Sequence, residues 1–275
     1  MPLTNNERLM HIAANGIRIH YAVDGNEDAN LGAPWLVFSN SLATDLTMWD
    51  AQAAAFAATH RVLRYDQRGH GRTEAPAGRY SFDLLIADAL ALMDALAIAQ
   101  ANFCGLSMGG ATALGLAQRH PNRIARAIVC DSGCASTPQS AQQWEERIAV
   151  ARAAGMEALV EPTLTRWFPP QIVAAKPPYL DKVRAMIRNT PVDGFIGCAA
   201  ALADHDFRSG VASTKPPVLF IAGEKDGGGT VPTAMRAMHR ELDGSRYVEL
   251  PGAGHISNLD DPAGFANALR AFLAA

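Results

Sequence analysis

The chain has 275 residues, of which 49 % are hydrophobic and 7 % aromatic, so it can bury a substantial core in one large or two modest domains. This composition argues against an intrinsically disordered protein. The formal net charge is −3 and no long run of like charges occurs, so we expect neither nucleic acid nor an anionic membrane surface as a partner.

The sequence also bears on where the protein works. Its first residues, MPLTNNERLM, lack the basic stretch followed by an apolar one that marks a signal peptide. No uninterrupted apolar segment is long enough to cross a bilayer. The cysteines form no CxxC pair and have no zinc-like spacing with histidine; they are Cys104, Cys130, Cys134 and Cys198. We therefore expect a cytoplasmic protein with reduced thiols and no metal site.

Predicted strands and helices alternate along the first part of the chain. Residues 10–25 are predicted to form a hairpin around Asn15-Gly16, a dipeptide that favours tight turns. A helix is predicted after Ser81, a plausible N-cap, and another within 109–121 that ends near Pro121. Further strands are predicted within 34–40, 60–71, 100–106 and 123–133. This rhythm predicts a mostly parallel sheet covered by helices on both faces.

The pattern changes after residue 132. Residues 133–212 read as helical, with no strand-like alternation. From residue 215 the strand rhythm resumes, with a last strand within 245–255 and a closing helix from Pro262. We therefore predict a core built from two parts, 1–132 and 213–275, that a helical insertion over 133–212 interrupts.

One short stretch, NFCGLSMGGA at 102–111, holds a serine between two glycines. The stretch contains the pattern G-x-S-x-G, formed by Gly105, Ser107 and Gly109, at a predicted strand-to-helix turn. Such a turn exposes the serine hydroxyl as a nucleophile. The two neighbours are glycines because a Cβ at either position would clash in so sharp a turn. The following helix directs its amides and positive dipole end toward a developing oxyanion. The alternative is a glycine-rich loop with an incidental serine, but the placement favours a nucleophile.

A serine nucleophile needs a base that a third group orients, and in this architecture the chain order is serine, acid, histidine. Asp226 follows a predicted strand in IAGEKDGGG, and Glu224 is an alternative acid two residues closer to that strand. His255 follows the last predicted strand in GAGHISNLDDP, and the glycines before it favour a catalytic over a solvated histidine. We predict that Ser107, Asp226 and His255 form a catalytic triad.

The oxyanion hole should combine two backbone amides. One is that of Met108, directly after the serine, and the other comes from the loop SNSLATDLTMW after the strand at 34–40, where Leu42 is the best candidate. Leu42 as ordinary loop packing is the alternative. His70 lies in the glycine-rich loop YDQRGHG, and we expect a structural role for it.

These motifs together resemble the 3-oxoadipate enol-lactonases of the α/β-hydrolase superfamily, and the likeness extends over nearly the whole chain. The segments that carry it are FSNSLATDLTMWDAQ, YDQRGHGRT, GLSMGG, MEALVEPTLTRWF and AGHISNLDDPAGF. The resemblance implies an α/β-hydrolase fold, a mostly parallel central sheet flanked by helices, with the insertion as a helical cap over the active site. It also implies hydrolysis of a lactone or ester, without metal or organic cofactor, in aromatic-compound catabolism.

Three positions depart from the family pattern. Ala43 stands where a glycine is usual, Ala203 stands where an arginine is expected, and EKDGGGT carries an extra glycine beside Asp226. The missing arginine matters because the enol-lactone has a free carboxylate that needs a partner. Arg147 and Arg166 are candidate replacements, although each could be a solvated helix residue.

We predict that Trp144, Arg147 and Trp167 bind the substrate, although core packing is the alternative for both tryptophans. Arg147 is the first candidate cation because it lies three residues after Trp144 and shares its helix face. Three other functions stay open at this point. They are a cofactor-free esterase or perhydrolase, a C–C bond hydrolase with a similar serine site, and a non-catalytic receptor, which an intact triad disfavours.

Overall fold

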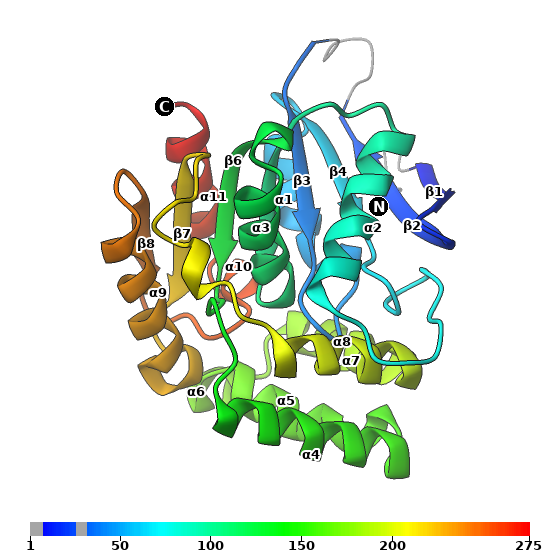
Figure 1. Cartoon of the computed structure of the whole chain (residues 1–275). Helices are drawn as coiled ribbons and strands as arrows, with labels where there is room; N and C mark the ends of the chain where they lie inside the picture. The colour runs from blue at the N-terminus through cyan, green and yellow to red at the C-terminus, as the bar shows by residue number, and fades with distance from the viewer. Residues whose placement is uncertain (1–7, 26–31) are drawn as a thin grey trace.

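The computed structural model of the protein describes residues 8–25 and 32–275 (Figure 1). Its described strands form one sheet in the order β1-β2-β4-β3-β5-β6-β7-β8. β2 pairs antiparallel with β1 and β4, and the pairs from β4 through β8 are parallel. The strands are β1 (Arg8–Ala14), β2 (Ile17–Asp24), β3 (Trp35–Ser39), β4 (Arg61–Tyr65), β5 (Ala101–Leu106), β6 (Ile124–Cys130), β7 (Val218–Gly223) and β8 (Arg246–Leu250). The prediction of a mostly parallel α/β sheet is confirmed.

Helices cover both faces of this sheet. α2 (Phe82–Ala95) and α3 (Met108–Arg119) lie side by side on one face, and α1 (Asp50–Phe56) and α11 (Pro262–Leu273) lie together on the other (Figure 1). Every residue of β5 and β7 is buried, as expected for parallel strands covered on two sides. The core therefore consists of two apolar layers, one on each side of the central strands.

Local signals in the sequence produce local structure at three places. Asn15 and Gly16 have φ values of 47° and 76°, the positive pair that a tight hairpin turn requires. The Ser81 hydroxyl accepts a hydrogen bond from the Leu84 amide at 3.2 Å and so caps α2. α3 ends at Arg119, two residues before Pro121, as predicted.

Two of the longer helices in the described part of the chain were not predicted. The alanine-rich α1 and the helix α9 (Thr230–Glu241) between β7 and β8 carry no strong stop or start signal in the sequence. α1 contacts α11 and β4, and α9 contacts β7 and β8. Tertiary packing against the sheet, rather than propensity alone, stabilises such short helices.

The chain between β6 and β7 forms five helices at the carboxyl ends of the strands (Figure 1). They are α4 (Pro138–Ala154), α5 (Val160–Trp167), α6 (Pro170–Ala175), α7 (Pro178–Asn189) and α8 (Val192–Asp204). The segments entering and leaving this group pair with each other, since Phe207 N donates to Cys134 O at 2.7 Å and Ser136 N to His205 O at 2.9 Å. The division at residues 133 and 212 stays a prediction.

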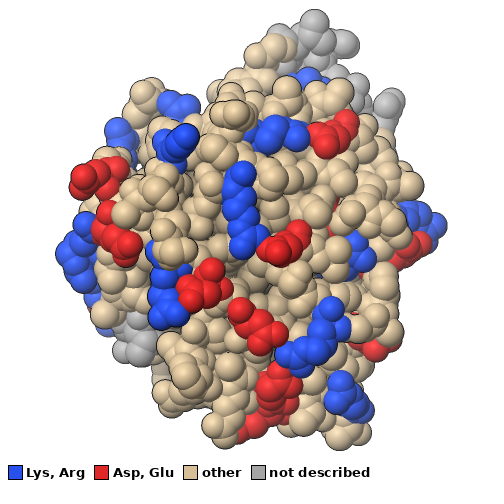
Figure 2. Space-filling model, in the orientation of Figure 1, with Lys and Arg blue, Asp and Glu red and all other residues tan. Residues whose placement is uncertain are grey.

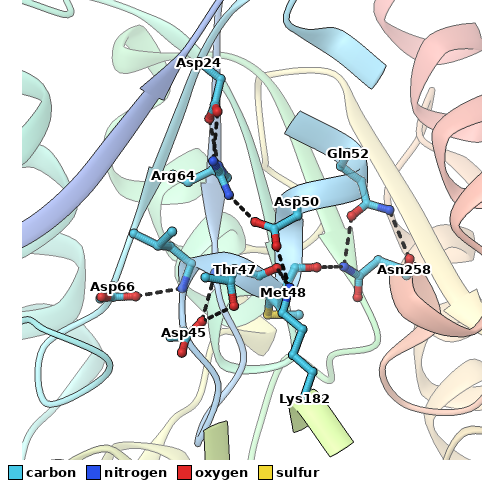
Figure 3. A network of polar contacts seen from close by, with 11 residues as sticks. Asp24, Asp45, Thr47, Met48, Asp50, Gln52, Arg64, Asp66, Lys182 and Asn258 are labelled. Carbon is cyan, nitrogen blue, oxygen red and sulfur yellow. Dashed lines mark hydrogen bonds and ion pairs between the residues drawn. The ribbon is translucent and has the colours of Figure 1, made fainter. Parts of the chain in front are cut away.

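A network of polar contacts, centred on one buried arginine, ties this helical group to the sheet (Figure 3). Arg64 of β4, whose side chain is 1 % exposed, binds Asp24 at 2.7 Å and Asp50 at 2.6 Å. Lys182 of α7 reaches the other oxygen of Asp50 at 2.5 Å and the carbonyl of Thr47 at 2.7 Å. A buried guanidinium needs such partners because an unpaired buried charge is strongly destabilising. The network holds α7 against the segment that follows Leu42.

Among the described residues, no helix combines the length and the apolar character that crossing a membrane would require.

Candidate active site

Ser107 stands at the sharp turn between β5 and α3. Its φ of 57° is a backbone conformation that residues with a side chain rarely adopt. The flanking glycines are in close contact with backbone, because a Cβ on Gly105 would lie 1.9 Å from Gly109 O and one on Gly109 would lie 2.1 Å from Ser39 O. The turn therefore has the geometry of a nucleophile elbow, with the serine side chain lifted out of the sheet.

Three side chains from distant parts of the chain meet at this turn. The Ser107 hydroxyl lies 2.9 Å from His255 Nε2, and His255 Nδ1 lies 2.8 Å from Asp226 Oδ2. The Asp226 side chain is 3 % exposed and that of His255 is 15 % exposed. A nucleophile, a base and an orienting acid in hydrogen-bond sequence can carry out acyl transfer.

Glu224, the alternative acid, points elsewhere. Its carboxylate binds Lys225 Nζ at 2.8 Å and accepts a hydrogen bond from the Gly252 amide at 2.8 Å. Its side chain is 39 % exposed. Although Glu224 and Asp226 are only two positions apart after β7, the carboxylate of Asp226 points toward His255 and that of Glu224 points toward solvent.

The helical insertion touches His255 directly. The His255 amide donates to the Trp167 carbonyl at 2.7 Å, and the two rings stack with centroids 5.8 Å apart. The preceding residue is held as well, because the Gly254 amide donates to Asp260 Oδ2 at 2.6 Å, while the Tyr179 hydroxyl donates to the other oxygen of Asp260 at 2.6 Å. Trp167, predicted to bind the substrate, therefore borders the candidate base.

The two predicted oxyanion donors are buried backbone amides. Leu42 is 3 % and Met108 0 % exposed, and neither amide donates a hydrogen bond to a group in the described part of the chain. A buried N–H without a partner is rare because it loses its hydration without compensation. Gly109 packs on Ser39 and Asn40, so the start of α3 and the loop that carries Leu42 adjoin. These amides can receive an oxyanion.

His70 contacts the loop that carries Leu42. Its Nε2 accepts a hydrogen bond from the Ala43 amide at 2.9 Å, and Nδ1–H donates to Arg68 O at 3.1 Å. Burial lowers the pKa of His70 to about 4, so the ring stays neutral and can act as an acceptor. Ala43 has a φ of 58°, a left-handed conformation that glycine adopts without steric cost.

Two arginines surround one indole in the insertion. The Arg147 guanidinium lies 4.5 Å from the Trp144 ring centroid, as expected for neighbours on one face of α4, and Arg166 of α5 approaches the same ring at 5.6 Å. Neither guanidinium hydrogen-bonds a carboxylate of the residues that the structure describes. Burial and the charge of Arg147 lower the pKa of Arg166 to about 9, while Asp226 raises it. Two partly buried cations beside one indole, of which Arg166 also interacts electrostatically with Asp226, can bind an anion.

Ala203, where an arginine was expected, is 5 % exposed in α8 and leaves no cation at that position. Within residues 8–25 and 32–275, no group of three or more histidine, cysteine or acidic side chains is arranged to hold a metal ion.

Asp131 is a feature of this site that the sequence interpretation missed. It directly follows β6, and its carboxyl contacts both the end of β7 and the start of α10 (Ser257–Asp260). The available signal was an acidic residue directly after a buried strand, on the edge of the sheet that also carries Ser107 and Asp226.

The fold and this site define a class of protein. A family profile described as the alpha/beta hydrolase fold matches residues 34–262, and the chain belongs to that family. The prediction of an α/β-hydrolase is confirmed.

Individual relatives narrow the likeness. The chain is 36 % identical to 3-oxoadipate enol-lactonase 2 of Acinetobacter baylyi over 95 % of each chain. It is similar in structure to the enol-lactonase of Burkholderia xenovorans LB400, with a TM-score of 0.92 and 41 % identity over 97 % of this chain and 100 % of that one. It is also 31 % identical to a putative carbamate hydrolase RutD of Pseudomonas syringae over 88 % of this chain and 94 % of that one. The predicted resemblance to the enol-lactonases is confirmed.

Proposed function

We propose that the protein is a serine hydrolase that opens 3-oxoadipate enol-lactone with water to give 3-oxoadipate. The observation that carries the proposal is the hydrogen-bonded sequence from Ser107 through His255 to Asp226, at 2.9 Å and 2.8 Å. Two enol-lactonases among the relatives support the substrate class.

In the proposed reaction, His255 Nε2 takes the proton of Ser107 while Oγ attacks the lactone carbonyl. The amides of Leu42 and Met108 hold the tetrahedral oxyanion, which collapses to an acyl-enzyme and expels the enolate. The enolate is a far better leaving group than an alkoxide; it takes the proton from the His255 imidazolium and becomes the ketone, which leaves His255 neutral again. A water molecule that gives its proton to His255 then attacks the acyl-enzyme and releases the product carboxylate and Ser107.

Asp226 has an electrostatic role in this scheme. It accepts the hydrogen bond from Nδ1–H of His255, which keeps Nε2 free to act as base, and it stabilises the imidazolium that forms. Because Asp226 is buried, this stabilisation is weakly screened by solvent.

The free carboxylate of the lactone is proposed to bind Arg147 and Arg166 beside Trp144, with Trp167 bordering the acyl group. The two partly buried guanidiniums, which form no hydrogen bond with a carboxylate of the described residues, support this assignment because a buried carboxylate needs a cationic partner. In this view residues 133–212 are a cap that supplies specificity, while 1–132 and 213–275 supply the chemistry. A cytoplasmic location stays a prediction.

A comparison of substrates tests the proposal. The wild-type protein is assayed on enzymatically generated 3-oxoadipate enol-lactone, on p-nitrophenyl acetate and butyrate, and on a simple carbamate. We expect a kcat/KM at least 100-fold higher for the lactone, since a charged hydrogen bond to the carboxylate is worth about 1.5–3 kcal/mol and two are available. Equal rates on lactone and aryl esters would instead identify a general esterase.

Three other outcomes are informative. Preference for the carbamate would favour the carbamate hydrolase activity for which the RutD relative is named, and which the same triad can perform on a carbamate carbonyl. No burst of p-nitrophenolate and no turnover of any substrate would favour a non-catalytic receptor. Cleavage of a C–C bond in a ring-fission product would favour the C–C hydrolase alternative.

A further inference from the structure

The carboxyl group of Asp131 connects the two loops that carry the acid and the base of the triad. Asp131 Oδ1 accepts a hydrogen bond from the Gly223 amide at 2.7 Å, and Oδ2 shares a short hydrogen bond with the Ser257 hydroxyl. Gly223 is the last residue of β7, three positions before Asp226. Ser257 begins α10, two positions after His255. Asp131 is 1 % exposed and Ser257 0 %.

We propose that Asp131 is a positioning residue for catalysis, which sets the register between the Asp226 loop and the His255 loop through these two hydrogen bonds. The proposal rests on the proposed function, because it assigns Asp131 a role in the same triad. Asp131 touches neither the nucleophile nor the base in the structure and acts through the segments that hold them.

The backbone of Asp131 is itself constrained. Its φ is 47°, in the left-handed region that non-glycine residues rarely occupy, and its amide donates to Ile221 O at 2.9 Å. The conformation turns the chain at the end of β6 so that the carboxyl projects between β7 and α10. Strain of this kind persists only where surrounding contacts impose it.

The electrostatic surroundings of Asp131 disfavour a second negative charge beside Asp226. Burial and the nearby carboxylates of Asp226 and Asp260 raise the pKa of Asp131 well above its usual range, although the bonds from Ser257 and Gly223 act in the opposite direction. Both hydrogen bonds are donated to the carboxyl group, by the Gly223 amide to Oδ1 and by the Ser257 hydroxyl to Oδ2.

An asparagine can keep a hydrogen bond to each of these two groups, with the direction of the bond to Ser257 reversed, whereas an alanine keeps neither. In Asp131→Asn the amide oxygen can accept from Gly223 and the NH₂ group can donate to Ser257. We therefore compare Asp131→Ala with Asp131→Asn as its matched control, and with Ser257→Ala, which removes only the bond to α10. Each variant is measured for kcat, KM and the pH dependence of kcat/KM on p-nitrophenyl acetate and on the lactone, together with its thermal midpoint.

For Asp131→Ala we expect kcat to fall about 10- to 100-fold on both substrates with KM within about twofold, because a displacement of about 1 Å in a catalytic group has effects of this size. The acid limb of kcat/KM should move to lower pH, since a displaced Asp226 stabilises the His255 imidazolium less. Asp131→Asn should keep kcat within about threefold and the wild-type acid limb, as the two bonds that position the loops are retained.

A folded Asp131→Ala protein with wild-type kcat and an unmoved acid limb would overturn the proposal, and so would an Asp131→Asn protein as impaired as the alanine variant. If Asp131→Ala does not fold, Ser257→Ala decides: a loss of kcat with the same downward shift supports the proposal, and an unchanged profile overturns it. The neutral ester separates the proposed role of Asp131 from the proposed lactone substrate. If the wild-type protein is inactive on the lactone, the lactonase proposal is refuted, but the role of Asp131 can still be measured on p-nitrophenyl acetate.

Discussion

Gly105 and Gly109 lie so close that a Cβ on Gly105 would be 1.9 Å from the carbonyl oxygen of Gly109. Both contacting groups belong to the backbone, and no side-chain rotation could relieve the collision. The proximity is what makes the turn at Ser107 sharp, with a φ of 57° at the serine. The glycines of the G-x-S-x-G pattern are therefore a packing requirement of the nucleophile's conformation.

Gly105→Ala should accordingly destabilise the fold by about 3 kcal/mol or more, at the upper end of overpacking effects, because the backbone must shift. Gly133→Ala is a suitable control, since its Cβ would meet only Ala135 O at 3.9 Å. Urea titrations of both variants measure the free energy of unfolding. Equal stability of the two would mean that the turn tolerates a side chain at Gly105.

Ser107→Ala should reduce kcat on the order of 10⁴-fold or more while the protein stays folded, because loss of a triad nucleophile leaves only binding and oxyanion stabilisation. The measurement is ester and lactone hydrolysis, with the thermal midpoint and circular dichroism as controls for folding. A folded variant that retained a near-native rate would refute the assignment of Ser107.

Asp226→Asn should lower kcat by roughly 10³- to 10⁴-fold, since an amide keeps the shape but favours the wrong imidazole tautomer. Glu224→Gln is the matched control, and it should be close to wild type because Glu224 binds Lys225 and Gly252 instead of His255. The measurement is the steady-state kcat of both variants, which identifies the carboxylate that acts as the acid of the triad. The reverse pattern would transfer the role of the acid to Glu224.

Arg147→Ala should raise KM for the carboxylated lactone by about 10-fold or more and leave p-nitrophenyl acetate almost unaffected, since a charged hydrogen bond is worth about 1.5–3 kcal/mol and the neutral ester cannot form it. Arg166→Ala should act in the same direction. Arg152→Ala, an exposed position on the same helix, is the control and should be neutral toward both substrates. Equal losses on both substrates would indicate a folding role for these arginines.

His70 should make stability depend on pH. The pKa of His70 in the folded protein is about 4, below the usual value of 6.5. Between these two pH values the unfolded chain therefore binds more protons than the folded one, and protonation favours unfolding. The neutral His70 thus contributes roughly 3 kcal/mol to the free energy of unfolding. This contribution is fully present above pH 6.5 and is lost as the pH falls to 4. Urea titrations at several pH values measure the free energy of unfolding, and its slope against pH between 4 and 6.5 should be shallower in His70→Gln than in wild type. Identical slopes would contradict the neutral state of His70.

Sequence reasoning predicted most core strands in their succession along the chain, the turn at Ser107 and the cap of α2, because each depends on residues that lie close together in the chain. The motifs and their order along the chain also singled out Ser107, Asp226 and His255, since each lies in a turn or loop after a predicted strand, and parallel strands end at one edge of the sheet. Glu224 remained an alternative to Asp226, because chain position does not say which way a carboxylate points.

Periodicity and local turn chemistry act over a few residues, so the α/β class, the elbow at Ser107 and the candidate triad could be predicted from the chain alone. Which distant groups meet depends on the packing of the whole fold. This packing brings Asp131 between Gly223 and Ser257, 92 and 126 residues away, and sets the Trp167 carbonyl against the His255 amide. It also leaves Arg147 and Arg166 around Trp144 without a hydrogen bond to a carboxylate of the described residues. Such contacts depend on how the strands and helices pack, and no local pattern in the chain encodes a hydrogen bond between segments so far apart.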